Sequence, residues 1–314
     1  MLTKEQHAER AHVFGASEVA SLFGYGFAGQ TAWHVWARLT DRLPERTEGD
    51  DKQASLAIKI GNALEPVAIE EAEAYYEQPI GRRQEWFRHK TLPLGAHIDG
   101  WLMKDNVPMD AKASGMSWLW GEAESDQAPP GILLQCHAIM MATQSTECRI
   151  FAILGGREPR AYNVLRDESI VKEIEAKIRW LWDEHVLTRI PPPDQPDMPT
   201  VKILKREPNR VVELPQEVLD EYEQRKEAAS EVTKGFEAFK ARIAGTLLYD
   251  SATDTFADAA TFPDGRAVTY YPQKGRVTID ARRLLQERPD IYAEYAKEGE
   301  AFRVFRPLKK GLPK

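Results

Sequence analysis

The stretch HIDGWLMKDNVPMDAKAS, residues 97–114, sets charged side chains into otherwise apolar sequence, and no other feature restricts the possible folds as much. Asp99 follows an apolar residue, Asp110 comes eleven residues later, and Lys112 lies two residues beyond Asp110. Burying a charge is costly unless the charge is paired or binds a cation. These residues therefore form either a solvent-facing strand with an ordinary ion pair or a site that uses all three charges.

The spacing predicts how the three side chains meet. If residues 94–103 and 108–114 are adjacent antiparallel strands, Asp99 and Asp110 lie side by side near one edge of a sheet. Lys112 then shares a face with Asp110, because side chains two apart on a strand point to the same side. Two close carboxylates repel each other unless a cation lies between them, and their oxygens suit Mg²⁺ or Mn²⁺ rather than zinc. A lysine there can orient a water or stabilise charge on a phosphate oxygen.

Composition limits the classes of protein to consider. The chain has 314 residues, 42% hydrophobic and 29% charged, which is ordinary for a globular protein with one large and one smaller domain. No apolar run approaches the ~20 residues of a membrane span, and the first ten residues lack a signal-peptide core. Cys136 and Cys148 cannot build a disulfide framework or a four-cysteine metal site. We therefore expect a cytoplasmic protein, of a bacterial host or phage, with no membrane segment.

The net charge of −7 argues against a passive basic coat for nucleic acid. It is compatible with an enzyme that gathers carboxylates around metal ions and holds DNA with a local basic patch.

Along the chain, helical and strand-like patterns alternate, which predicts a mixed α/β fold. A short helix over 16–26 should have Ser17 as its N-cap, and Thr31 should cap the next helix. Pro66 predicts a break or kink in a long helix over 54–77. Further helices are predicted over 131–142, 168–187 and 215–243, further strands over 85–90, 149–156 and 161–167, a hairpin within 265–280, and a final helix after it.

The proline-rich stretch 191–199 has the composition of a linker. It divides the chain into a domain over residues 1–200, which carries the three charges, and a C-terminal accessory region over 201–314 of unknown role.

Several motifs together resemble a known family. Asp99 with Asp110-Ala111-Lys112 resembles the signature of the PD-(D/E)xK nucleases, with isoleucine at 98 in place of the usual proline. The upstream GNALEP, containing Glu65, is similar to the helix-borne glutamate motif of the lambda exonuclease/YqaJ-type viral recombinases.

Two more motifs follow the order of that family. PPGILLQCHAIMMA resembles its proline-to-glutamine helix and supplies Gln135, and Arg10 with Ser17-Glu18-Val19 resembles its 5′-phosphate-binding segment. The resemblance spans roughly residues 8–190.

The resemblance implies a restriction-endonuclease-like α/β core, a mixed sheet flanked by helices, with a smaller C-terminal helix–hairpin–helix extension. It implies an exonuclease that uses Mg²⁺, with Mn²⁺ as a possible substitute, to degrade the 5′-ended strand of linear double-stranded DNA. The product would be a 3′ single strand for phage-type recombination. Implied partners are DNA ends, a single-strand annealing protein and further copies of the chain in a ring.

The resemblance also implies roles for individual residues. Asp99 and Asp110 would bind the metal directly, the Ala111 carbonyl would be a further ligand, and Glu65 would act directly or through water. Lys112 would position the attacking water, assisted by Gln135. The terminal 5′-phosphate would be held by Arg10 and Ser17, and contacted by His97.

Each residue taken singly also has an ordinary interpretation. Glu65 could be a surface glutamate, Gln135 could bond a backbone carbonyl, Ser17 could be only a helix cap and Arg10 could be solvated. Two other functions also remain open. One is a site-specific PD-(D/E)xK endonuclease, and the other is a non-catalytic DNA-binding protein on the same fold.

Overall fold

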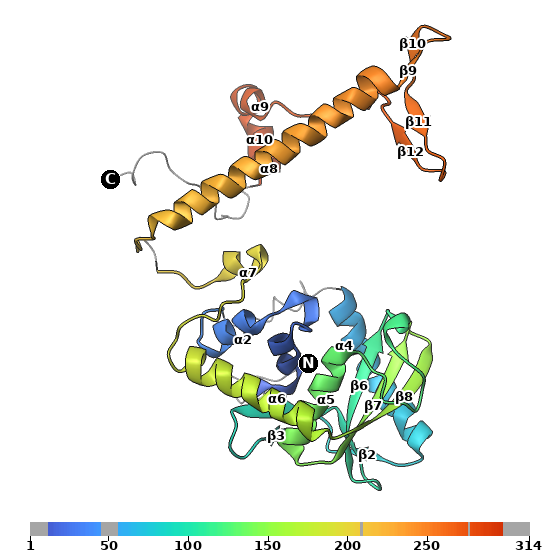
Figure 1. Cartoon of the computed structure of the whole chain (residues 1–314), viewed down its shortest axis with the longest axis vertical. Coiled ribbons are helices and arrows are strands. Elements are labelled where there is room, and N and C mark those ends of the chain that lie inside the picture. The colour runs from blue at the N-terminus through green and yellow to red at the C-terminus, as the bar shows by residue number, and fades with distance from the viewer. Residues whose placement is uncertain (1–11, 45–55, 208–209, 276, 298–314) are drawn as a thin grey trace. The chain divides into compact units, whose positions relative to one another are not determined.

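The computed structural model describes residues 12–44, 56–207, 210–275 and 277–297, so Arg10 lies outside the described residues. The chain forms two compact units, Met1–Arg206 (unit 1) and Glu207–Lys314 (unit 2), whose elements are labelled in Figure 1. None of the described helices is long and apolar enough to cross a membrane.

A mixed five-stranded sheet is the centre of unit 1, with the strand order β2-β5-β6-β7-β8. Strands β6 and β7 are parallel, and the other neighbours are antiparallel. The strands are β2 (Ile80–Gly81), β5 (Gly100–Leu102), β6 (Val107–Ser114), β7 (Glu147–Leu154) and β8 (Glu158–Leu165).

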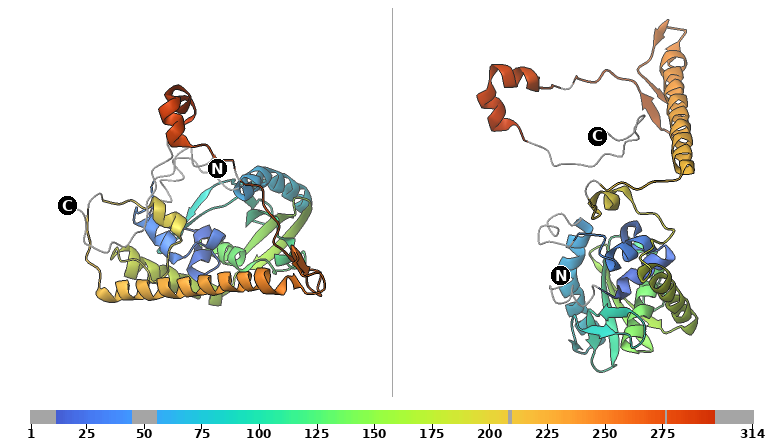
Figure 2. Two further views of the ribbon diagram at one scale, coloured as in Figure 1. Left: turned by 90° about the horizontal axis from the view of Figure 1, so that it is seen from above. Right: turned by 90° about the vertical axis from the view of Figure 1, so that its left-hand side faces the viewer.

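Helices cover both faces of this sheet, as the side chains of β7 show. Ile150 and Ala152 pack into the core that contains α5 (Pro130–Thr143). Phe151 and Ile153 point the other way, into the core beneath α4 (Leu56–Tyr76). This alternation is the two-residue period of a strand that is buried on both sides. The right-hand view of Figure 2 shows α4, in light blue, on one side of the strands.

The N-terminal segment and the last helices of unit 1 complete the larger core. Trp33 and Trp36 of α2 (Ala32–Leu39) are buried there, and Trp36 donates to the His185 carbonyl over 3.0 Å. The predicted cap at Thr31 is confirmed. The remaining elements of unit 1 are η1 (Ala16–Phe23), η2 (Phe27–Gly29), η3 (Ser117–Leu119), α6 (Glu168–Arg179), the π-helical turn η4 (Trp180–Val186), α7 (Met198–Ile203) and a three-stranded sheet of β1 (Phe14–Gly15), β4 (Leu94–His97) and β3 (Trp86–Arg88).

One local prediction in unit 1 is wrong. Residues 94–103 are not one strand: β4 ends at His97 and β5 begins at Gly100, and the two belong to different sheets. The chain changes sheets there because the Ile98 N–H and C=O bond to Glu85 and Gln84 instead of to β6. Helix α4 continues through Pro66, where the sequence predicts a break or kink. One lost hydrogen bond is tolerated where a helix packs firmly, as α4 does through Ala68 and Ala72.

The predicted fold class is confirmed in its main feature, a mixed sheet with helices on both faces, followed by a smaller helix–hairpin–helix part. In unit 2, the long helix α8 (Gln216–Arg242) is followed by the π-helical turn η5 (Ile243–Leu247) and two hairpins. The hairpins are β9 (Tyr249–Asp250) with β10 (Thr255–Phe256) and β11 (Ala259–Thr261) with β12 (Ala267–Thr269), and two short helices follow, α9 (Ala281–Glu287) and α10 (Pro289–Tyr295).

The hairpin predicted within 265–280 is misplaced. Among the described residues only β12 falls in that interval, and it pairs with the preceding β11. The turn between them is made by Pro263-Asp264-Gly265, where Gly265 has φ +85° and its N–H donates to the Phe262 carbonyl. Pro-Asp-Gly is a strong turn signal, because proline fixes its own φ and glycine adopts a positive one without strain.

Candidate active site

The antiparallel pairing of β5 and β6 brings Asp99 beside Asp110. Gly100 is opposite Met109, so the register carried one residue further sets Asp99 opposite Asp110. The Ala111 N–H donates to Asp99 Oδ2 over 2.8 Å, which fixes the Asp99 carboxylate against the edge of β6. The predicted strand pairing is therefore confirmed, although Asp99 lies in the bend just before β5 rather than within a strand.

Lys112 and Gln135 converge on Asp110. Lys112 Nζ lies 2.7 Å from Asp110 Oδ2, as expected for residues two apart on one strand face. Gln135, on α5, donates its Nε2 to Asp110 Oδ1 over 2.9 Å. The partner of the Gln135 amide is thus the carboxylate and not a backbone carbonyl. Asp110 is only 2% exposed, so these two donors replace the water that a carboxylate would otherwise bind.

Gln84 links Glu65 to Asp99, a role that no sequence pattern predicts. Its Nε2 donates to Glu65 Oε1 over 2.8 Å and lies 3.5 Å from Asp99 Oδ1. Glu65 comes from α4 and Gln84 from the segment between β2 and β3, so the contact joins three separate parts of unit 1. Gln84 belongs to no recognised motif, and only the folded chain brings it to the carboxylates.

Electrostatics in this cluster follow from burial and from the neighbouring charges. The protein packed around Asp99 raises the pKa of its carboxyl to about 7, and repulsion from Asp110 and Glu65 adds to the rise, while Lys112 and the Ala111 N–H oppose it. Burial alone would lower the pKa of Lys112, but its attraction to Asp110 and Asp99 and its hydrogen bond to Asp110 raise it instead. Lys112 is therefore a fixed positive charge beside two crowded acids.

The chemistry of these donors fits a divalent cation that prefers oxygen. Asp99 and Asp110 supply carboxylate oxygens, and their mutual repulsion is the kind that a cation relieves. The Ala111 N–H faces Asp99, and a strand residue turns its C=O to the same side as its N–H, so the Ala111 carbonyl faces that side as well.

Within the described residues, no group of three or more His, Cys, Asp or Glu side chains is arranged to hold a metal. Glu65 stays apart from the pair of aspartates, since the Gln84 amide reaches toward both Glu65 and Asp99.

His97 and Ser17 are the described residues that the sequence predicts to contact the 5′-phosphate. The ring of His97 packs against the ring of Trp86, with centroids 4.5 Å apart, and the two residues are opposite each other in the β3–β4 pairing. Ser17 is exposed in the first turn of η1. Its predicted role as the N-cap is wrong, because Gly15 occupies that position.

Glu18 explains why the cap lies at Gly15. Its carboxylate accepts from the Gly15 N–H over 2.8 Å and forms a two-pronged ion pair with Arg38, at 2.6 and 2.7 Å. Arg38 also donates to the Val13 carbonyl over 2.8 Å. This pair anchors the start of η1 to α2, so the helix begins where Glu18 can reach back to Gly15.

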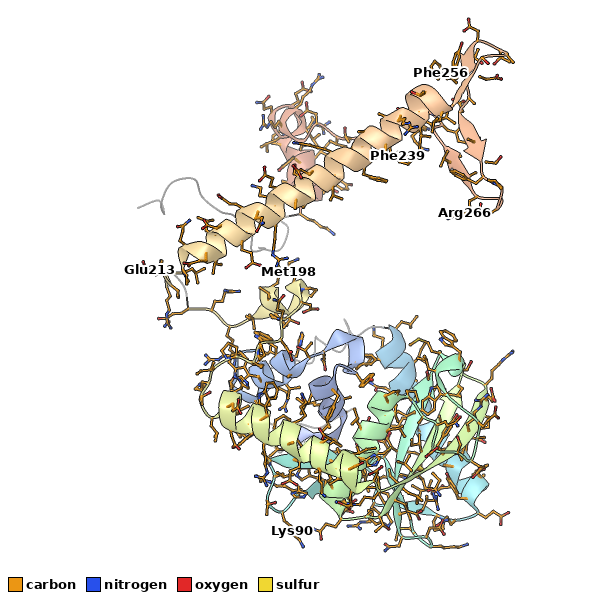
Figure 3. The ribbon with its side chains drawn as sticks, in the orientation of Figure 1. Lys90, Met198, Glu213, Phe239, Phe256 and Arg266 are labelled. Carbon is orange, nitrogen blue, oxygen red and sulfur yellow. The ribbon has the colours of Figure 1, made fainter. Side chains whose placement is uncertain are left out.

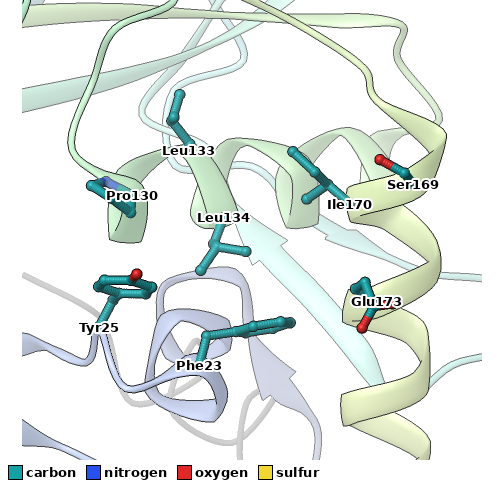
Figure 4. A pocket seen from close by; sticks show the side chains of 8 residues that line it. All are labelled: Phe23, Tyr25, Pro130, Leu133, Leu134, Ser169, Ile170 and Glu173. Carbon is teal, nitrogen blue, oxygen red and sulfur yellow. The ribbon is translucent and has the colours of Figure 1, made fainter.

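Two cavities in the described part of unit 1 are lined by residues other than the carboxylate cluster. An apolar cavity of about 360 Å³ lies among η1, α5 and α6 (Figure 4), where Phe23 and Tyr25 face Leu134. A more polar one of about 640 Å³ adjoins His137 and Asn163. The carboxylates and Lys112 therefore form a separate site at the sheet edge.

The chain is similar to several solved structures. No curated protein matches the chain. Among solved structures, an alkaline exonuclease from Laribacter hongkongensis is 19% identical, covers 60% of this chain and 94% of its own, and has a TM-score of 0.47. Its complex with dAMP gives 18% identity with the same coverage and TM-score. A phage-related exonuclease from Haemophilus somnus 129PT is 13% identical, covers 58% of this chain and 98% of its own, and has a TM-score of 0.38.

A family model, the YqaJ-like viral recombinase domain, matches residues 5–146. This interval includes every residue that the sequence predicts for the site, from Arg10 to Gln135. Over residues 5–146 this chain is thus similar to the YqaJ-like viral recombinase domain, and the matched interval contains the convergent residues Asp99, Asp110, Lys112 and Gln135.

Proposed function

We propose that unit 1 is a metal-dependent exonuclease that hydrolyses phosphodiesters from the 5′ ends of linear double-stranded DNA. The observation that carries the proposal is the arrangement of charged side chains along the edge of β6. Asp110 holds Lys112 at 2.7 Å, while the next residue, Ala111, holds Asp99 through its N–H at 2.8 Å. Two acids that can hold a divalent cation, with one fixed positive charge beside them, form a set that can support metal-assisted phosphodiester hydrolysis.

Asp99 and Asp110 would hold Mg²⁺, or Mn²⁺ in its place, with the Ala111 carbonyl as a further oxygen ligand and Glu65 acting directly or through water. When bound, such an ion supplies positive charge that polarises the phosphate and lowers the pKa of a bound water. Lys112 would orient the attacking water and stabilise negative charge as it develops on the phosphate oxygens. Gln135 would keep the Asp110 carboxylate in orientation through its 2.9 Å hydrogen bond.

The 5′-to-3′ direction rests on the resemblance of Arg10 and Ser17 to the family's 5′-phosphate segment, with His97 as a further candidate contact. A terminal phosphate carries nearly two negative charges and an internal one carries a single charge, so a pocket with a planar two-pronged arginine prefers an end. We therefore propose that linear duplex with 5′-phosphates is digested at least ~10-fold faster than duplex with 5′-hydroxyls, about 1.4 kcal/mol of positioning. Equal rates would remove Arg10 and Ser17 from the site.

The deciding experiment compares end-labelled linear duplex with covalently closed plasmid, each in Mg²⁺ and in EDTA. An exonuclease digests the linear substrate in Mg²⁺ and spares the plasmid. A protein of the endonuclease class would cut the plasmid, and a non-catalytic DNA-binding protein would cut neither. Lys112→Met is the inactive reference, and Lys172→Met, an exposed lysine on α6, is the matched control that keeps full activity.

For the cellular role, we propose that the 3′ single strand serves recombination with an annealing protein and that several copies assemble as a ring around DNA. Both proposals come from the resemblance to the viral recombinases.

A further inference from the structure

Helix α8 of unit 2 carries an apolar stripe that the exonuclease function does not use. The helix has 27 residues and none of them is buried. Its large apolar side chains are well exposed, with Val232 at 74%, Phe236 at 60% and Phe239 at 52%. Phe239 is labelled on α8 in Figure 3. Such a row of exposed apolar groups marks a surface that binds another surface.

The spacing of this stripe is that of a coiled coil. The apolar members are Val218, Tyr222, Val232, Phe236, Phe239 and, directly after the helix, Ile243. Arg225 and Ala229 fill the two remaining positions of the same series, so that steps of four and three residues alternate without interruption from 218 to 243. A strict seven-residue repeat follows a helix only if the helix winds around another one, because a straight helix has 3.6 residues per turn.

The partner must be a helix of comparable length. At about 1.5 Å per residue, α8 extends for roughly 40 Å. The other described helices of unit 2, α9 and α10, have seven residues each, or roughly 10 Å, and are too short to cover the stripe. An α8 helix from a second copy of the chain has the required length and the same repeat.

The charges decide the direction of the two helices. A parallel pair would set Arg225 against its own copy in the centre of the interface, which buries two like charges. An antiparallel pair instead sets Arg225 opposite Phe236 of the second copy. In the single chain Lys240 Nζ lies 5.1 Å from the centroid of that ring, and Arg225 pairs with Glu221 of its own helix at 2.6 Å. An arginine over an aromatic face is a favourable contact.

The other layers of the antiparallel arrangement agree with it. The small side chains of Ala229 and Val232 meet at the centre, where the helices approach most closely. Beside the stripe, Glu221, which pairs with Arg225 in its own helix at 2.6 Å, would also lie next to Arg242 of the second copy, so opposite charges would flank both ends. This is the reciprocal pattern of a twofold interface, in which residue i contacts j and j contacts i.

We propose that α8 pairs with α8 of a second copy of this chain as an antiparallel two-stranded coiled coil. The interface is independent of the carboxylate site and of any assembly made by unit 1. Val232 and Phe239 are well exposed, so changing them leaves the fold of the single chain undisturbed.

The first test measures the mass of the full chain in solution by light scattering and sedimentation velocity. Val232→Lys/Phe239→Lys should halve the mass of the wild-type assembly, because two charges enter the centre of the interface. The matched control, Ala238→Lys/Ala241→Lys, adds the same charge to exposed positions beside the stripe and should leave the mass unchanged. A mass that is equal in wild type and stripe variant, or halved in both variants, overturns the proposal.

The second test reads the direction of the helices and does not depend on the stripe variant. A Glu221→Cys/Arg242→Cys chain cannot close a disulfide within itself, because 21 helical residues separate the positions by roughly 31 Å. On oxidation it should form covalent dimers, and so should a mixture of the two single variants. Asp220→Cys, on the opposite side of the helix, should remain monomeric in the same assay. Dimers from Asp220→Cys alone, or none from the double variant, contradict the antiparallel pairing.

Discussion

Replacing Lys112 by methionine tests the centre of the candidate site through stability as well as through activity. The change keeps the length of the side chain but removes the charge that lies 2.7 Å from Asp110 Oδ2. Asp110 is 2% exposed, so in the variant a buried carboxylate keeps only the Gln135 amide as a partner. Breaking one side of a buried ion pair costs about 3–5 kcal/mol, because the remaining charge stays buried without compensation.

Lys112 is 22% exposed, so water can reach part of the space that it leaves, and we expect the lower end of that range, about 3 kcal/mol. For a unit of this size that corresponds to a fall in Tm of roughly 6–12 °C. The measurement is made in EDTA, so that no cation replaces the lysine. All eight tryptophans lie in unit 1, so their fluorescence reports the unfolding of unit 1 alone.

The double variant Asp110→Asn/Lys112→Met separates the charge effect from packing. With both charges removed, most of the lost stability should return, and the coupling between the two positions should reach about 2 kcal/mol. DNA hydrolysis should stay at least ~10²-fold below wild type in both variants, as is usual when a charge-stabilising group is lost. A Tm within 1 °C of the Lys172→Met control, or strictly additive effects, would show that Lys112 does not neutralise Asp110.

Three further outcomes are expected. DNA hydrolysis should be lost in EDTA, return with Mg²⁺ or Mn²⁺ and stay absent with Ca²⁺, because the looser coordination of Ca²⁺ positions water poorly. Asp99→Asn should abolish hydrolysis, and a preference for zinc would show that the metal ligands are wrongly assigned. Gln84→Leu should raise the Mg²⁺ concentration for half-maximal rate by ~10-fold, since partners of ligands orient them, and an unchanged Mg²⁺ titration would exclude Gln84. Glu18→Gln should lower the stability of unit 1 by about 1–2 kcal/mol in urea unfolding, because Arg38 loses its partly buried two-pronged partner; a midpoint equal to wild type would refute this.

The parts of the site that lie close together along the chain could be predicted from the sequence. The two-residue period of a strand fixes Lys112 on the face of Asp110, whatever surrounds them. Alternating apolar patterns and the turn between the two strands were sufficient to predict that Asp99 and Asp110 become neighbours. The cap at Thr31 was predictable for the same reason, because it depends on a few consecutive residues.

Contacts between distant segments, in contrast, depend on how the whole of unit 1 packs. Gln84 reaches Glu65 and Asp99 because α4 packs on one face of the sheet and the segment after β2 lies close to it, and no local pattern encodes that meeting. The start of η1 shifts from Ser17 to Gly15 for a similar reason, since Arg38 on another helix holds Glu18 in place. The division of residues 94–103 also depends on distant partners. Local propensity is nearly the same on both sides of Asp99, and the choice of sheet depends on which strand offers its hydrogen bonds.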